Sequence, residues 1–166
     1  MGWAWAAEFT KGWPFEPIRA GDKISLTELR LREQAMARAP LFANLPKQDL
    51  RSLAKVTSVE RYQAGSTVVK EGAPGTAFFV ILEGRSRVMI GSRTITGLGP
   101  GDFFGEISLL DGDPRTASVI ADSPLLCLKL GGSHFLQLLS DQPKLMLKLL
   151  REVARRLRGA ESPPVG

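Results

Sequence analysis

Hydrophobic residues in the middle of the chain fall into short runs that glycines and polar residues interrupt. Between Val56 and Leu130 these runs recur at intervals of roughly ten residues, and they include Thr67–Val69, Phe78–Leu82, Arg87–Ile90 and Thr94–Thr96. Runs of this length, punctuated by turn residues, are typical of short antiparallel strands. The pattern favours an all-β roll or barrel over a series of βαβ units.

The last of these runs is a strict alternation. Leu126, Leu128 and Leu130 alternate with Cys127 and Lys129, which predicts a half-buried strand. Cys127 is the only cysteine of the chain, so an intramolecular disulfide is excluded. Because it stands among leucines, we expect a small buried hydrophobic residue rather than a reactive thiol.

Helical patterns precede the β-rich region. Leu26–Arg38 is composed of strong helix formers, with Ser25 as the expected N-cap and Pro40 beyond its end. A second short helix is predicted after Leu45, with Pro46 at its first turn. The chain therefore enters the β-rich region through two helices.

Two more helices are predicted after Leu130. The first spans Ser133–Leu139, and the second runs from Pro143 to about Arg158, where Gly159 can end it. Apolar residues recur in the second helix at three- and four-residue steps and form one stripe: Met146, Leu150, Val153 and Leu157. We treat this stripe as a candidate homodimer surface.

Together these patterns predict a mainly β fold with flanking helices: an antiparallel, jelly-roll-like β-roll with helices at both ends. We divide the chain into an extension (1–24), one domain (25–158) and a tail (159–166). The extension is rich in aromatic residues, namely Trp3, Trp5, Phe9, Trp13 and Phe15. It is either a loosely packed segment or a docking peptide, because clustered exposed aromatics mark partner surfaces.

The composition excludes several classes of function. His134 is the only histidine, so a metal site of several histidines, as in metal-dependent cupins, cannot form. A catalytic Ser-His-Asp triad could form only around His134 itself. We expect His134 at the surface, and we expect no enzyme activity and no cofactor. No apolar run has the length of a membrane span and no secretory signal is present, so a cytoplasmic location is expected. The net charge is +5, and much of the positive charge lies in the last helix. These basic residues form either a solvated face or a surface for an anionic membrane or an acidic partner.

The segment Phe104–Val119 contains the candidate chemistry. Gly105 opens a short helix from Glu106 to Leu110, and the unpaired amides of a first helical turn can receive an anion. Pro114 fixes the approach to Arg115, whose planar guanidinium matches two phosphate oxygens. A strand predicted from Thr116 can donate further amides. Glu106 would repel a phosphate, so it is expected to accept a hydrogen bond from another group, such as a ribose hydroxyl.

In its residue order and spacing, this segment resembles the phosphate-binding cassette of the cyclic-nucleotide-binding domain family. That family includes the regulatory subunit of cAMP-dependent protein kinase, cyclic-nucleotide-gated channels and bacterial catabolite activators, and the resemblance covers roughly residues 25 to 158. It implies that Glu106 accepts the ribose 2′-hydroxyl, that Gly105 permits close backbone approach and that Arg115 pairs with the cyclic phosphate. It also implies that amides of Ile107, Ser108 and Ala117 assist Arg115 and that Val88 packs beside the ribose or base.

Two positions of the motif bear on selectivity and signalling. Thr116 follows the arginine where the kinase subunit has alanine, and its hydroxyl could reach the guanine 2-amino group or a phosphate oxygen. Related domains with this threonine include both cGMP and cAMP responders, and we expect cAMP rather than cGMP. Thr76 stands where several relatives carry an acidic residue behind the phosphate arginine, so a relay from Arg115 across the roll is expected to be missing.

The resemblance also implies a lid and a partner. The last helix folds over the bound base in this family, which makes Arg155, Arg156 and Leu157 the lid candidates. Only about eight residues follow that helix, too few for a helix-turn-helix, so we expect no direct DNA binding. We expect a bacterial module, either a stand-alone sensor or a regulatory piece of a longer protein, that signals to an effector protein by moving its helices. The alternative is a vestigial pocket on an interaction scaffold, which would have lost Glu106 or Arg115.

Overall fold

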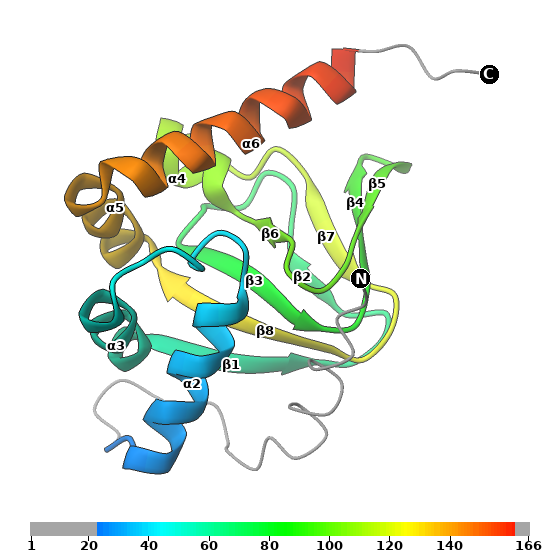
Figure 1. Ribbon diagram of the computed structural model, residues 1–166. Helices are drawn as coiled ribbons and strands as arrows, with labels where there is room; N and C mark the ends of the chain where they lie inside the picture. The colour runs from blue at the N-terminus through cyan, green and yellow to red at the C-terminus, as the bar shows by residue number, and fades with distance from the viewer. Residues whose placement is uncertain (1–22, 162–166) are drawn as a thin grey trace.

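The computed structural model describes residues 23–161 and contains two four-stranded antiparallel sheets (Figure 1). One sheet has the order β1 (Thr57–Tyr62), β8 (Leu125–Gly131), β3 (Ala77–Glu83) and β6 (Phe103–Phe104). The other has the order β2 (Thr67–Val69), β7 (Ser118–Ala121), β4 (Ser86–Ile90) and β5 (Arg93–Leu98). The predicted mainly β fold with flanking helices is confirmed, and the predicted extension (1–24) lies almost wholly outside the described residues.

Two hydrophobic cores cover the two faces of the first sheet. Leu126, Leu128 and Leu130 of β8 pack toward the helices, in a cluster with Phe78 of β3. Leu125 and Cys127 point the other way, into the space between the two sheets. The prediction of a half-buried strand was therefore wrong for β8. The helix-side cluster covers one face of the strand and the second sheet covers the other, so only Lys129 and Gly131 of β8 keep partial contact with water.

The N-terminal helices are α2 (Leu26–Arg38) and α3 (Lys47–Val56). The Ser25 hydroxyl accepts a hydrogen bond from the Glu28 amide at 3.1 Å, so the predicted N-cap is confirmed. One turn further on, the buried Arg32 guanidinium pairs with Glu28 at 2.6 Å and donates to the Thr57 carbonyl at the start of β1. This contact joins α2 to the β-roll through a buried cation.

The C-terminal helices are α5 (Gly132–Asp141) and α6 (Pro143–Glu161), and α6 crosses over the roll beside α4 (Glu106–Asp111) (Figure 1). Gly159 lies inside α6, so the prediction that it ends the helix was wrong. Glycine interrupts a helix only weakly, at about 1 kcal/mol relative to alanine. The tail boundary expected at this residue therefore falls within the helix.

The apolar residues of α6 occupy two faces. Leu145 and Leu149 are buried in the helix-side core, and Val153 packs against it. The predicted stripe is otherwise exposed, at 38% for Met146, 52% for Leu150 and 57% for Leu157. A dimer through this stripe stays a prediction. Among residues 23–161, no helix combines the length and the apolar character that crossing a membrane requires.

Candidate functional site

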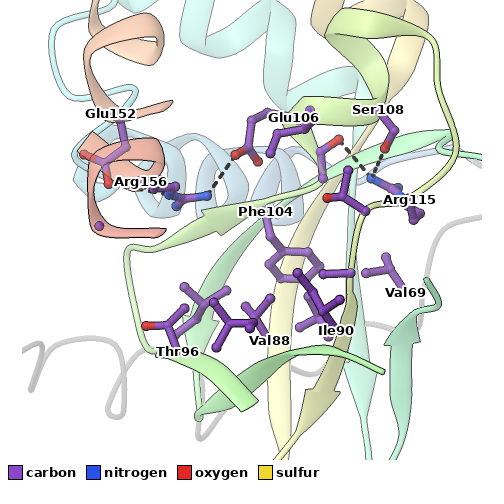
Figure 2. A pocket seen from close by; sticks show the side chains of 18 residues that line it. Val69, Val88, Ile90, Thr96, Phe104, Glu106, Ser108, Arg115, Glu152 and Arg156 are labelled. Atoms are coloured by element: carbon purple, nitrogen blue, oxygen red, sulfur yellow. Dashed lines mark hydrogen bonds and ion pairs between the residues drawn. The ribbon is translucent and has the colours of Figure 1, made fainter. Parts of the chain in front are cut away.

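A cavity of about 480 Å³ lies between the second sheet, the α4 segment and α6. Eight of the residues predicted for the site line it together: Val88, Gly105, Glu106, Ile107, Ser108, Arg115, Thr116 and Ala117. Figure 2 shows Glu106, Ser108 and Arg115 on one side and the side chains of β4 and β5 on the other. The structure therefore gathers residues from β4, α4 and the segment before β7 into one concave surface. The predicted strand at Thr116 begins two residues later, at Ser118.

Gly105 forms the sharp turn that begins α4. Its φ of +93° lies in the left-handed region, which glycine adopts without strain. A Cβ at this position would stand 2.7 Å from the Ala77 carbonyl oxygen and 2.8 Å from Nη1 of Arg115. Only glycine lets the backbone approach Arg115 this closely.

Arg115 is held in place by neutral acceptors. It is 7% exposed, and it donates to the carbonyls of Ala77 at 2.7 Å and Gly105 at 2.9 Å and to the Ser108 hydroxyl at 3.2 Å. Burial lowers the pKa of its guanidinium, and the charge of Glu106 acts in the opposite direction. Within residues 23–161 Arg115 makes no ion pair, so its charge is positioned without being neutralised by a direct contact.

Thr76 is exposed, and its carbonyl accepts from the Gly132 amide at 2.9 Å. The acidic residue that several relatives carry behind the arginine is absent at this position. The carbonyls of Ala77 and Gly105 support Arg115 from this side instead.

Glu106 is 1% exposed, and its carboxylate accepts from Nη1 of Arg156 at 2.9 Å. Burial raises the pKa of the Glu106 carboxyl, while Arg156, the backbone amide of Glu106 and Arg115 lower it without cancelling the effect of burial. The carboxylate expected to accept a ribose hydroxyl is therefore already bonded to the last helix in this structure.

Of the three lid candidates, only Arg156 lines the cavity. Its guanidinium also donates to the Phe103 carbonyl at 2.7 Å and lies 4.3 Å from the centre of the Phe103 ring. Arg155 is exposed and pairs with Glu152 at 3.4 Å, and Leu157 is exposed as well. The structure thus brings Arg156 to the site and leaves Arg155 and Leu157 outside it.

Sequence reasoning missed the apolar wall of the cavity. It is formed mainly by strand residues, namely Val69, Ile90, Ile95, Thr96, Leu98, Phe104 and Val119. In β4, Val88 and Ile90 are two positions apart and share a face, and Val88 pairs with Thr96 of β5. Period-two alternation could have identified Ile90 from Val88. Glu152 and Gly159 also line the cavity, and no local signal in the sequence indicates this.

The other chemistry-bearing residues lie elsewhere. His134 is exposed and Cys127 is fully buried, as predicted. Among the described residues, no three His, Cys, Asp or Glu side chains gather in a way that could hold a metal ion.

A family model described as "Cyclic nucleotide-binding domain" matches residues 59–142, half of the chain. A cyclic nucleotide-gated potassium channel of Mesorhizobium japonicum is 31% identical over 156 residues, covering 94% of this chain and 41% of the channel. A cAMP-dependent protein kinase regulatory subunit of Aspergillus fumigatus is 34% identical over 121 residues, covering 70% of this chain and 29% of the subunit.

A CRP-like cAMP-activated global transcriptional regulator of Mycobacterium tuberculosis is 32% identical over 133 residues, covering 76% of this chain and 58% of the regulator. The chain thus spans less than two thirds of each of these relatives. The solved structure of Sp-2Cl-cAMPS bound to PKAR CBD2 has a TM-score of 0.70 at 20% identity, covering 84% of this chain and 95% of that one. That likeness concerns the fold, and it agrees with the two sheets and flanking helices described above.

Proposed function

This chain belongs to the cyclic nucleotide-binding domain family, and we propose that it is a regulatory module that binds a cyclic nucleoside monophosphate and catalyses no reaction. One observation carries the proposal. Arg115 and Glu106, a cation and a carboxylate at most 7% exposed, line a single cavity whose opposite wall is apolar. A nucleotide presents the matching set: an anion, a hydroxyl donor and a flat apolar base. A vestigial pocket would not be expected to keep both buried charges, because each costs free energy to bury.

In the proposed complex the cyclic phosphate lies against Arg115. The guanidinium is already oriented by Ala77, Gly105 and Ser108, so binding requires little reorganisation of this side chain. The first-turn amides of α4, at Ile107 and Ser108, and the amide of Ala117 supply further donors. The base lies along the β4 and β5 wall, beside Val88.

The ribose 2′-hydroxyl would donate to Glu106, which Arg156 contacts in this structure. Ligand and α6 therefore compete for the same carboxylate. We propose that binding changes the position of α6 by releasing or re-pairing Arg156, and that an effector protein senses this change. The size of the shift is limited by the difference in ligand affinity between the two positions of α6.

We propose that cAMP binds more tightly than cGMP. The strand wall is apolar at Val69, Val88, Ile90 and Ile95 and offers few partners for the exocyclic oxygen and amino group of guanine. Burying those groups unpaired costs free energy. Thr116 lines the cavity and is the hydroxyl that could partly offset this cost for cGMP.

Titration calorimetry with cAMP, cGMP and 5′-AMP tests the proposal on folded protein that has been freed of co-purified nucleotide. We expect low-micromolar or tighter binding of cAMP, about −8 kcal/mol, with weaker binding of cGMP and much weaker binding of 5′-AMP. Arg115→Ala should weaken cAMP binding at least about tenfold, because a charged hydrogen bond contributes about 1.5–3 kcal/mol. Absence of heat with all three ligands would favour the interaction scaffold instead.

A further inference from the structure

A second cavity, of about 640 Å³, lies on the other side of Arg156 and is lined mostly by polar groups. Its walls are α6, the β3–β4 turn, the segment after α2 and the loop from Gly99 to Phe103. We call it the basic groove, because five of its lining residues are cations: Arg85, Lys148, Arg151, Arg155 and Arg156. Among the described residues that line it, only Asp102 and Glu152 are acidic.

Within the part of the chain that the structure describes, two of the cations have no partner for their charge. Within residues 23–161, the guanidinium groups of Arg85 and Arg151 make neither an ion pair nor a hydrogen bond. By contrast, Lys148 donates to the Pro40 carbonyl, and Arg155 and Arg156 both contact Glu152. Arg85 lies against the backbone of Gly99, close enough that a Cβ there would stand 3.4 Å from its Nη1. Within the described residues, unpaired positive charge therefore comes from two walls of the groove, the β3–β4 turn and α6.

The spacing of these cations indicates the shape of the occupant. Lys148, Arg151 and Arg155 follow one another along α6 at steps of three and four residues, so they span about 10 Å of the helix axis. A single phosphate could not contact all of them. The rise from Arg151 to Arg155 is about 6 Å, close to the distance of about 6.6 Å between alternate side chains of an extended peptide. A flat bilayer surface would not enter a groove of this kind.

From the charge and spacing of these residues, we propose that the basic groove binds an extended acidic segment of a partner protein, with alternate carboxylates paired to Arg151, Arg155 and Arg85. Arg85 and Arg151 line this groove and not the first cavity, so this binding can be measured independently of the proposed function. It would give the effector a contact on the helix that is expected to move.

The test is fluorescence anisotropy of the full chain, without nucleotide and at low salt, with a labelled peptide of alternating Glu and Ser. A peptide of alternating Gln and Ser is the uncharged control. We expect the acidic peptide to bind and the uncharged one not to bind, and the affinity to fall as salt is added. The variant Arg85→Gln/Arg151→Gln should bind the acidic peptide about fivefold more weakly or worse, because it loses two ion pairs.

The matched control is Arg30→Gln/Arg51→Gln, which removes the same charge from exposed positions of α2 and α3. It should bind the peptide within about twofold of the unmodified chain. Equal losses in the two double variants would overturn the proposal, because net charge alone would then explain the binding. The proposal would also be overturned if Arg85→Gln/Arg151→Gln lost binding to phosphatidylserine vesicles but still bound the peptide as the unmodified chain does. Calorimetry with cAMP on the same variant should be unchanged, so failure of the groove and failure of the nucleotide site are distinguishable.

Discussion

The buried carboxyl of Glu106 is expected to favour folding in its protonated form and ligand binding in its ionised form. Because burial raises its pKa on folding, the folded chain holds the Glu106 proton more tightly than the unfolded chain does. The associated stability is present at low pH and is lost as the pH rises through the folded-state pKa. At neutral pH the ionised carboxylate therefore costs folding free energy, and that ionised form is the acceptor expected to bind a ribose hydroxyl.

Replacing this carboxylate by its neutral isostere should separate the two properties. We expect Glu106→Gln to keep or raise the melting temperature near neutral pH, since Arg156 can still pair with Glu152 and with water. The same variant should bind cAMP about tenfold more weakly, because a charged hydrogen bond becomes a neutral one. Scanning calorimetry and ligand titration measure the two effects.

The pH dependence provides the control for this prediction. In the unmodified chain the affinity for cAMP should fall as the pH is lowered through the raised pKa of Glu106, and in Glu106→Gln that fall should be absent. Glu33→Gln, at a position outside the cavity lining, should change neither property. A large loss of melting temperature in Glu106→Gln would contradict the assignment of Glu106 to ligand binding at the expense of stability.

Thr116 is the residue at which the preference between cAMP and cGMP can be tested. It directly follows Arg115 in the chain, lines the cavity and is exposed. We expect Thr116→Ala to weaken the binding of cGMP several-fold, by about 1 kcal/mol, because one neutral hydrogen bond is lost. The affinity for cAMP should stay within about twofold of that of the unmodified chain. Competition of both nucleotides against a fluorescent cAMP analogue measures the ratio. An equal loss for both would instead assign the hydroxyl to the phosphate.

At the scale of elements, the attachment of α2 to the roll depends on a buried cation. Arg32→Ala would remove the partner of the buried Glu28 carboxylate and of the Thr57 carbonyl together. We expect a loss of about 3 kcal/mol in the free energy of unfolding, measured with denaturant, because an uncompensated buried charge remains.

Two further variants test whether the unpaired buried charge causes this loss of stability. Arg30→Ala, at an exposed position of the same helix, should cost less than about 0.5 kcal/mol. Replacing both partners, with Glu28→Leu and Arg32→Met together, should cost less than Arg32→Ala alone, since no unpaired charge is left. If all three variants lost equal stability, packing rather than charge would hold α2.

The elements differ in how far the sequence predicts them. The α4 segment was predicted closely because its chemistry is local: a glycine turn, a short helix and an arginine lie within one continuous stretch, Gly105 to Arg115. The burial of β8 on both faces could not be read from its alternation, because it depends on the helices that cover one face and on the second sheet that covers the other. Period-two patterns give the two faces of a strand but not what covers each face.

The C-terminal helix shows the same limit. Arg155, Arg156 and Leu157 are neighbours in the sequence, yet they point in directions about 100° apart around the helix axis. The orientation of α6 over the roll selects Arg156, and the packing of Leu149 and Val153 in the helix-side core sets that orientation. Glu152 enters the cavity for the same reason. A tertiary contact of this kind leaves no signal in the local pattern.

At the scale of the whole molecule, α6 connects the two cavities, because Glu152 and Arg156 line both. We expect Arg156→Gln to loosen the last turns of α6 in the ligand-free chain, since the contacts with Glu106 and the Phe103 carbonyl are lost. Hydrogen exchange should be faster in the last two turns of α6 and unchanged in β8. Arg155→Gln, which removes an exposed neighbour, is the matched control, and equal effects in the two variants would contradict a specific role for Arg156.

The ion pair between Arg156 and Glu106 also has a kinetic consequence. If the nucleotide can reach Glu106 only after this pair has opened, entry is a two-step process in which a motion of the protein precedes capture. The observed association rate should then level off at high nucleotide concentration, at the frequency with which the helix opens, instead of rising in proportion to concentration. In Arg156→Gln the plateau should move to a higher rate, and stopped-flow fluorescence would resolve it. A sensor of this kind would respond to a rise in its ligand at a speed that its own structure determines.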